Sequence, residues 1–505
     1  MALDTDRFRL RTFLDALSAA GELEVREAPI DLIDVAAALE GNPKAVLLRK
    51  VGPEGWELAG NVTASRTRLA LAFEIPPAAL LPELLRRLRL PPQIVEVDRA
   101  EAPVQEVVLT GEEADLTALP VHLQHGLDGG PYISASVDFT VDPSTGWTNV
   151  GMRRLMLRGR RETGIDLVAP SDLRALYQEA VRRGARLPVS FVVGAHPIDH
   201  VAATMRLPVD ELDLLASLRA APLAVVRGVT NDIRVPADAE LVLEGYLDGG
   251  WTEPEGPYGE FLGYYGAVKQ NPLFHLTAIT RRRDALFQTS TIGGRSLHRT
   301  DTAQLGSLRT EATVWRALET AVREPVAVHA SAASGGSFTV RVALRQRVAG
   351  EARNAIAAVF GCLANVKHVF VVDPDIDVFS EAQMDWALAT RFQADRDLVV
   401  QAGFRTLPLD PSLDGRLTGA KAGFDLTVPF GRPATVETLI PEPPRLEGRC
   451  FASVEAALDD GPKRFDELMA AVGSRDGREV VRALEALRAG GRLGRDGDGR
   501  YLLGR

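Results

Sequence analysis

The sequence has little of what marks secreted, membrane-spanning or nucleic-acid-coating proteins. It contains two cysteines, Cys362 and Cys450, far apart and outside any CxxC or Cys/His pattern, so a disulfide framework is excluded. No run of 18 apolar residues occurs, and no membrane-spanning helix is expected. An excess of basic charge is also missing, because 58 Lys and Arg face 68 Asp and Glu. The net charge of −10 argues against a chain that coats nucleic acid or a membrane surface.

The N-terminus lacks the uninterrupted apolar stretch of a signal peptide, because charged residues occur throughout it. Its apolar residues instead recur on one side of an expected amphipathic helix, namely Phe8, Leu10, Phe13, Leu14 and Leu17. Together with the low cysteine content, this pattern predicts a cytoplasmic protein that is not attached to a membrane.

What the sequence does have is enough apolar residues for several cores. With 505 residues, of which 46% are hydrophobic, the chain exceeds what one core usually supports. Changes in pattern predict an α/β domain over 1–118, a β-rich domain over 119–310, a second α/β domain over 311–440, a linker over 441–449 and a small module over 450–505.

Short strand patterns dominate the central segment. Runs such as YISASVDFTV and RRLMLRG alternate with turns rich in Gly, Pro, Asp and Asn. One clear helix is expected between them, with Ser171 as its N-cap and Gly184 at its end. Because short strands prevail and no GxGxxG follows a strand, the segment predicts a β-barrel and not a Rossmann sheet.

The C-terminal module, residues 450–505, shows three helix patterns followed by a hairpin with a Gly/Asp turn, which resembles a winged helix-turn-helix. Its ten Lys and Arg are balanced by ten Asp and Glu. DNA-reading domains are usually distinctly basic. We therefore expect the module to mediate interaction or oligomerisation, and we do not expect a nucleic-acid partner.

The loop over 251–266, WTEPEGPYGEFLGYYG, sets Glu255 and Glu260 around two glycines and a proline. Glycine permits close backbone approach and proline fixes φ, so such a loop can be held rigidly. Two carboxylates in one partly dry cleft titrate as a pair, and one is pushed toward the protonated form that a general acid needs. An ordinary surface turn is the alternative, and the spacing alone favours that alternative.

The segment over 128–157 runs from a Gly-Gly-Pro sequence through a strand and a DPSTG turn to Asn149 and Arg154. An arginine beside a pair of glutamates could bind a substrate carboxylate or keep one glutamate ionised. The alternative is an arginine that points outward from a strand.

Taken together, GGPYI, DPSTGWTN and PEGPYGE in this order resemble the UbiD family of prenylated-flavin-dependent decarboxylases, over roughly residues 5–440. The resemblance implies that the β-rich domain is a split β-barrel that binds the flavin, flanked by two α/β domains. It also implies that Arg154, Glu255 and Glu260 form a Glu-Arg-Glu catalytic network. In that network Glu260 would deliver the proton that replaces the carboxylate.

The same resemblance implies a prenylated FMN held through Mn²⁺ or Mg²⁺, with K⁺ as a further candidate ion. Asn149 and Glu211 match two of the family's metal ligands, whereas Asp172 stands where the family commonly has histidine. Aspartate is a competent oxygen ligand for such a cation. In the first turn of a helix its negative charge also interacts favourably with the helix dipole. Asp172 can therefore be a metal ligand or a residue that stabilises the helix start, and both interpretations stay open. Lys421 matches a lysine near the flavin phosphate. Other residues expected at the flavin are Ser134, Gly151, Met152, Arg153, Arg154, Ala203, Thr204 and Met205.

The predicted activity is the reversible, non-oxidative decarboxylation of an α,β-unsaturated or (hetero)aromatic carboxylic acid. The resemblance further implies a homo-oligomer that receives its cofactor from a flavin prenyltransferase. One alternative is a flavin-dependent oxidoreductase on the same barrel, which would need no paired glutamates. The other is a catalytically decayed sensor with a winged-helix output, against which the presence of Arg154, Glu255 and Glu260 speaks. The sequence does not identify the acid.

Overall fold

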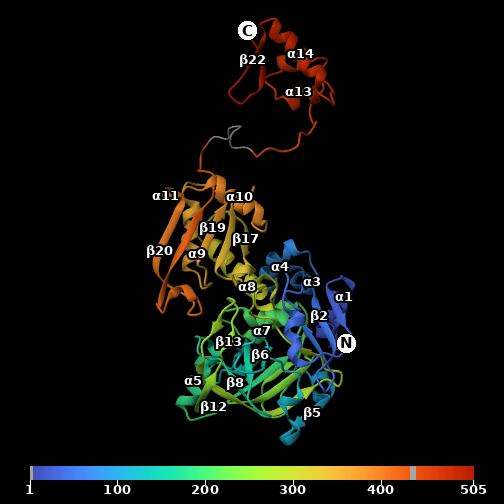
Figure 1. Ribbon diagram of the computed structural model, residues 1–505, viewed down its shortest axis with the longest axis vertical. Helices are drawn as coiled ribbons and strands as arrows, with labels where there is room; N and C mark the ends of the chain where they lie inside the picture. Colours follow the sequence, from blue (N-terminus) through green and yellow to red (C-terminus); the bar gives the residue numbers. More distant parts are fainter. Residues whose placement is uncertain (1–3, 433–439, 505) are drawn as a thin grey trace. The chain divides into compact units, whose positions relative to one another are not determined.

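The structure, a computed structural model, describes residues 4–432 and 440–504, and its chain groups into two compact units, Met1–Val428 and Pro429–Arg505. The first unit begins with helix α1 near the N-terminus (Figure 1). The apolar side of α1 is buried, as the sequence pattern indicates. A small sheet follows it. The elements of this N-terminal part are α1 (Leu10–Ala19), β1 (Leu23–Arg26), α2 (Val35–Leu39), β2 (Ala45–Val51), β3 (Trp56–Gly60), α3 (Arg66–Ala72) and α4 (Leu80–Arg87).

A closed antiparallel β-barrel forms the centre of the first unit. Its strands follow one another in the order β12-β9-β6-β7-β8-β15, and β15 pairs with β12 to close the ring. Apolar side chains such as Phe191 and Phe274, which meet edge to face at 4.8 Å, fill one of its cores. The predicted barrel is therefore confirmed. Its strands are β6 (Tyr132–Val141), β7 (Thr148–Leu157), β8 (Glu162–Ile165), β9 (Leu187–Val193), β12 (Leu241–Glu255) and β15 (Lys269–Arg281).

Several shorter elements join the barrel to its neighbours. β4 (Ile94–Glu96) pairs with β10 (Leu223–Arg227), and β10 pairs with β11 (Arg234–Pro236). The remaining links are β5 (Val107–Thr110) on β15, β16 (Phe287–Gln288) on β3, and the pair β13 (Tyr258–Gly259) and β14 (Tyr265–Gly266). These strand pairs join residues on both sides of the expected domain border at residue 118. The domain borders stay predictions.

Helices pack beside the barrel where the flavin residues were expected. α5 (Asp172–Arg182) begins as predicted after Ser171, whose side chain accepts a hydrogen bond from the Arg174 N–H at 3.2 Å. α6 (Pro197–Thr204) is buried along nearly its whole length and contacts α7 (Glu211–Arg219), α8 (Asp301–Leu318) and strand β7. Among the described residues, no helix is both long and apolar enough to cross a bilayer.

The C-terminal part of the first unit is an α/β domain, as expected, built on a mixed sheet in the order β17-β18-β19-β21-β20. The pattern VFVV does form a strand, β19, that lies between two parallel neighbours. The elements are β17 (Pro325–Ala330), β18 (Thr339–Leu344), α9 (Glu351–Gly361), β19 (His368–Val372), α10 (Glu381–Arg391), α11 (Ala394–Asp397), β20 (Leu398–Arg405) and β21 (Thr418–Asp425).

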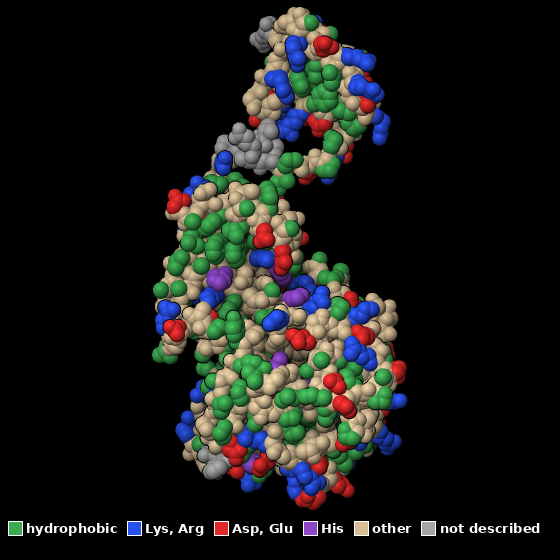
Figure 2. All heavy atoms as spheres, viewed as in Figure 1, with side chains coloured by type: hydrophobic (Ala, Val, Ile, Leu, Met, Phe, Trp, Pro, Cys, Tyr) green, Lys and Arg blue, Asp and Glu red, His purple; other side chains and the backbone are tan. Residues whose placement is uncertain are grey.

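In the described residues of the second unit, three helices and a hairpin surround a small apolar core. Leu484 and Leu487 are buried in this core, whereas Val481 is 54% exposed and Val480 takes the buried place. On the face shown in Figure 2, basic and acidic side chains are interspersed around apolar ones. A winged-helix fold stays a prediction for this unit. Its elements are α12 (Val454–Asp459), α13 (Phe465–Ala471), α14 (Arg478–Ala489), β22 (Leu493–Arg495) and β23 (Tyr501–Leu503).

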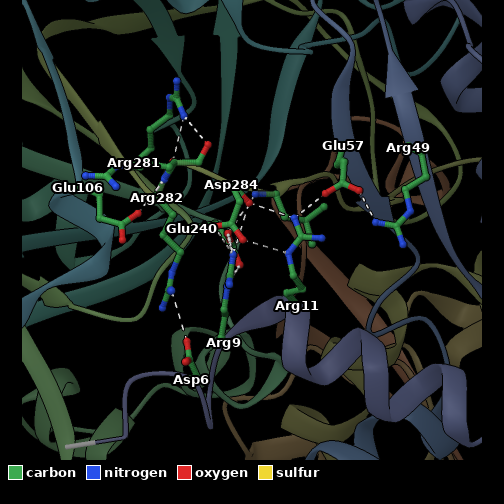
Figure 3. Close-up of polar contacts among 12 residues, drawn as sticks. Asp6, Arg9, Arg11, Arg49, Glu57, Glu106, Glu240, Arg281, Arg282 and Asp284 are labelled. Atoms are coloured by element: carbon green, nitrogen blue, oxygen red, sulfur yellow. Dashed lines mark hydrogen bonds and ion pairs between the residues drawn. The ribbon is translucent and has the colours of Figure 1, made fainter.

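Charged residues link the N-terminal part to the barrel. Arg9 lies 3.0 Å from the buried Glu240 and 2.8 Å from Asp284, and Arg11 lies 2.5 Å from Glu57 (Figure 3). Burial alone would disfavour the charge of Arg9, but the hydrogen bonds and charges of Glu240 and Asp284 raise its pKa above the ordinary value. The N-terminal part is thereby held against the barrel that carries the candidate site.

Candidate active site

Arg154 on β7 gathers carboxylates that lie far apart in the sequence. Its Nε donates to Glu255 Oε1 at 3.0 Å, its Nη1 to Glu260 Oε1 at 2.9 Å and its Nη2 to Asp166 Oδ2 at 2.8 Å. Although burial opposes its charge, Glu260 and Glu255 raise the pKa of Arg154 above its usual range. A planar guanidinium can serve several carboxylates at fixed angles, which a lysine cannot do. The contacts expected among Arg154, Glu255 and Glu260 are therefore present.

The loop between Glu255 and Glu260 is held tightly by close backbone approaches. A Cβ on Gly129 would lie 2.2 Å from the Gly256 carbonyl oxygen, and one on Gly259 would lie 2.4 Å from His125 Nδ1. Gly256 itself has a φ of +95°, which side-chain-bearing residues rarely adopt. A side chain at Gly129 or Gly259 would collide with these neighbours, so the loop that carries the two glutamates would have to shift.

The two glutamates have unequal surroundings. Glu255 is fully buried and accepts hydrogen bonds from Arg154 Nε, from Arg154 Nη2 at 3.3 Å and from Asn271 Nδ2 at 3.1 Å. Glu260 is 6% exposed, and its Oε1 accepts from Arg154 and lies 3.7 Å from Lys269 Nζ. Glu255 is thus fixed by several hydrogen-bond donors. In Glu260 only Oε1 takes part in the contacts just described, and Oε2 does not.

Two tyrosines and a third carboxylate surround Arg154 and its two glutamates. The Tyr258 ring is buried, and the Arg154 guanidinium carbon lies 4.5 Å from its centre, an attractive cation–π arrangement. Burial and the charge of Glu255 raise the pKa of Tyr132, which keeps that hydroxyl protonated. Burial favours the neutral form of Asp166, but the charges of Arg154 and Lys269 lower its pKa. Asp166 therefore remains an anion that helps to orient Arg154.

A second cluster of acids lies around Asn149, five residues before Arg154 on the same strand. Asn149 Nδ2 donates to Asp138 Oδ2 at 2.8 Å, and Glu211 Oε2 accepts from the Val150 N–H at 2.5 Å. Burial raises the pKa of Asp138 to about 6. Burial, with the charges of Asp138 and Asp172, raises the pKa of Glu211 to about 8. Burial thus favours the protonated forms of these two carboxyl groups near neutral pH.

The acid cluster suits a cation. Asp138 Oδ1 is buried without a hydrogen-bond partner, and its cationic neighbour Arg153 approaches only to 3.4 Å. In the described part of the chain no three His, Cys, Asp or Glu side chains converge on one point, so an amide such as Asn149 would have to contribute. Oxygen donors of this kind are those that Mn²⁺ and Mg²⁺ accept. Asn149 and Glu211 are close together as expected, and the exposed Asp172 lies near enough for its charge to affect Glu211.

The other residues expected at the flavin fall into two places. Gly151, Met152 and Arg153 lie on β7 beside Asn149, and a Cβ on Gly151 would meet Asp138 Oδ1 at 2.9 Å. Ala203, Thr204 and Met205 end helix α6, which packs on β7, and Ser134 lies on β6. Lys421 instead lies on β21 of the C-terminal α/β domain, where its Nζ donates to the Phe360 carbonyl at 2.7 Å.

A small cavity adjoins the Glu260 loop. It has a volume of about 50 Å³ and is lined by Gln124, His125, Ser290 and Gly293 among others. A Cβ on Gly293 would lie 3.3 Å from the Glu260 carbonyl oxygen, so the cavity wall and the loop are in contact. Arg299, which follows the TIGGRSL segment, also lines it.

Sequence reasoning missed several residues of the site. Asp166, Lys269 and Asn271 contact Arg154, Glu255 or Glu260 but belong to no recognisable motif. Asp138 could have been found, because a charged residue within the otherwise apolar run YISASVDFTV is unusual for a buried strand.

Comparison with known proteins places the whole first unit in one family. Family models described as the N-terminal, Rift-related and C-terminal domains of 3-octaprenyl-4-hydroxybenzoate carboxy-lyase match residues 14–88, 95–296 and 303–426. The chain belongs to the UbiD family of carboxy-lyases. The matched residues stop before the C-terminal module, which these models leave unexplained.

Relatives within the UbiD family include decarboxylases of different acids. An anhydromevalonate phosphate decarboxylase of Methanosarcina mazei is 30% identical over 83% of this chain and 95% of its own. The structure of the UbiD-class enzyme HmfF from Pelotomaculum thermopropionicum, in complex with FMN, has a TM-score of 0.79 and 32% identity, covering 84% and 95% of the two chains. The vanillic acid decarboxylase of Sedimentibacter hydroxybenzoicus, in its open form, has a TM-score of 0.78 and 27% identity, covering 86% and 96%.

Proposed function

We propose that this UbiD-family chain decarboxylates an α,β-unsaturated or (hetero)aromatic carboxylic acid with prenylated FMN as its cofactor. The observation that carries the proposal is Arg154, on barrel strand β7, held between Glu255 and Glu260, each within 3.0 Å. HmfF was solved with FMN, and an evolved dimeric form of it with prFMN, which supports the choice of cofactor.

The chain's own residues provide binding and proton transfer. When bound, the prenylated flavin supplies the electron sink that lets the carboxyl carbon leave as CO2. Glu260 then donates its proton to the carbon that lost the carboxyl group, and Arg154 pairs with the glutamate that remains. Glu255 and Asp166 hold Arg154 in place through the hydrogen bonds described above. Because each proton transfer can run backward, the same residues support carboxylation.

The cofactor would be held beside Arg154. Asn149, Asp172 and Glu211 would bind the divalent cation. This is supported by the hydrogen bond of Glu211 to the Val150 N–H, next to Asn149, and by the charge of Asp172, which reaches Glu211. Gly151, Met152, Arg153 and the end of α6 would border the flavin, since that helix packs on β7. Ser134, whose hydroxyl accepts from the Ser290 N–H at 2.9 Å, would stand on the side of the small cavity.

Homo-oligomerisation is part of the proposal. Large apolar side chains of the C-terminal α/β domain are exposed, among them Trp386 at 41% and Val400 at 61%. Burying such side chains against a second copy is a common use of exposed apolar surface.

The proposed activity can be tested with protein co-expressed with a flavin prenyltransferase. We expect the bound cofactor to have the mass of prenylated FMN, and CO2 to be released from at least one acid in a panel of vinylic, aromatic and heteroaromatic carboxylates. Protein loaded with plain FMN is the control and should release none. Nicotinamide oxidation by the FMN-loaded protein, without CO2 release from any acid by either form, would favour the oxidoreductase alternative.

Replacement of Asp172 by Ala is expected to remove most of the bound Mn²⁺ without destabilising helix α5. The helix is already capped by Ser171, and Asp172 is exposed with its charge near Glu211. Metal analysis of the purified variant measures the loss. The matched control is Ser171→Ala, which should keep the metal and lose about 1 kcal/mol of stability. A metal-replete Asp172→Ala protein with lower stability would mean that Asp172 acts only on the helix dipole.

A further inference from the structure

Asp166 and Lys269 form an ion pair that touches both Arg154 and Glu260. Asp166 follows strand β8, and Lys269 begins strand β15. Lys269 Nζ donates to Asp166 Oδ2 at 2.9 Å, and the same oxygen accepts from Arg154 Nη2 at 2.8 Å. Lys269 Nζ also lies 3.7 Å from Glu260 Oε1. The pair thus contacts the proposed proton donor and the arginine that holds it.

The charges of these side chains do not balance. Arg154 and Lys269 carry one positive charge each and face three carboxyl groups, those of Glu255, Glu260 and Asp166. With all three carboxyl groups ionised, the five side chains would carry a net negative charge in a largely buried place. Charges held so close together titrate as one group, and one proton makes this group neutral.

The remaining titratable side chains around Glu260 do not change this balance near neutral pH. Burial raises the pKa of Tyr132 and of Tyr258, so both hydroxyls stay protonated. His125 borders the Glu260 loop and lies 3.2 Å from Asp128. Asp128 also accepts from two backbone N–H groups at 2.9 Å each, so its charge is compensated without Arg154.

The hydrogen bonds indicate which carboxyl group takes the proton. Asp166 and Glu255 each accept several bonds, from Arg154 and from other donors. Among the described residues, the Glu260 side chain accepts from Arg154 alone, and Lys269 comes no closer than 3.7 Å. Hydrogen bonds to a carboxylate favour its ionised form, so the carboxylate with the fewest bonds is protonated first. That carboxylate is Glu260, as its proposed role requires.

We propose that Lys269 and Asp166 are positioning residues that set how strongly Glu260 holds its proton. The inference rests on the proposed function, in which each turnover moves the Glu260 proton to carbon and Glu260 then recovers one proton from water. Lys269 favours the carboxylate that remains after the transfer. Asp166 binds the Lys269 ammonium at 2.9 Å and keeps it at the longer distance from Glu260, which allows the proton to return.

Lys269→Met and Asp166→Asn are expected to shift the protonation of Glu260 in opposite directions. Loss of the ammonium removes a positive charge beside Glu260, so the proton should be kept to a pH about one unit higher. Asp166→Asn removes a negative charge and frees Lys269 and Arg154 to face Glu260, so the proton should be lost about one unit lower. A purely structural role of the pair predicts no such opposed shifts.

Two readouts report the shifts. In the full-length chain before flavin is added, the infrared C=O band of the protonated Glu260 carboxyl group is the band that Glu260→Gln removes, and its pH midpoint is measured. In protein loaded with prenylated flavin, the alkaline limb of the pH–rate profile of CO2 release should move with that midpoint. The matched control is Lys367→Met, which breaks a lysine–aspartate contact of 2.8 Å in the C-terminal α/β domain and should move neither.

Unchanged midpoints, or shifts of both variants in the same direction, would overturn the proposal. If Lys269→Met does not fold, Lys269→Gln removes the same charge while keeping a polar group near Asp166, and the same upward shift is expected. Absence of CO2 release from every acid would refute the proposed function. Opposed shifts of the infrared band would still show, in that case, that Lys269 and Asp166 act on Glu260.

Discussion

Glu260→Gln is expected to abolish CO2 release while the flavin stays bound. Glutamine has nearly the same shape, and its carbonyl oxygen can still accept the Arg154 hydrogen bond that Glu260 Oε1 accepts at 2.9 Å. It cannot hold or release the proton that must replace the carboxyl group. Positioned acid–base groups typically contribute a factor of about 10² to 10⁴, so turnover should fall by at least that much.

The measurement is CO2 release by protein loaded with prenylated flavin, beside cofactor content from absorbance. Glu162→Gln makes the same chemical change on strand β8, where the side chain is 51% exposed and paired with His275, and should leave turnover unchanged. Wild-type-like CO2 release by Glu260→Gln would remove Glu260 from the proposed mechanism. Loss of flavin together with activity would instead assign Glu260 to cofactor binding.

The fold was predictable where local pattern decides it. Alternating short strands and turns indicated a barrel, and Ser171 indicated the start of α5, because hydrophobic period and capping act over a few residues. Helix α14 shows the limit of this reasoning. Val481, Leu484 and Leu487 recur at a helical spacing in the sequence, but the small core of the second unit buries Val480 and leaves Val481 54% exposed. The tertiary partner, which the sequence does not contain, determines which side is covered.

The candidate site was predictable only in part, for a similar reason. Glu255 and Glu260 came from one loop and Arg154 from a motif in fixed order with it. Asp166, Lys269 and Asn271 join them because β8, β12 and β15 pair in the barrel, a register that no local pattern specifies.

Arg154→Met is expected to lower both turnover and stability strongly. The substitution leaves the fully buried Glu255 without its cation and removes a donor from Glu260 and Asp166. Removing one partner of a buried ion pair usually costs about 3–5 kcal/mol. Arg154→Lys keeps the positive charge but lacks the planar guanidinium that bonds several carboxylates at once. Compared with Arg154→Met, it should therefore recover part of the stability and little of the turnover. Urea unfolding and CO2 release measure the two effects.

The double variant Arg154→Met/Glu255→Gln separates the structural from the catalytic role of Arg154. Neutralising Glu255 removes the buried unpaired charge, so the double variant should be more stable than Arg154→Met, with a coupling energy above about 1 kcal/mol. Turnover should not recover, because Glu260 still lacks the guanidinium that pairs with it after proton transfer. If stability and turnover recovered together, Arg154 would serve only to neutralise Glu255. If Arg154→Met were as stable as the native chain, the contacts described here would not be those that hold the glutamate loop in place.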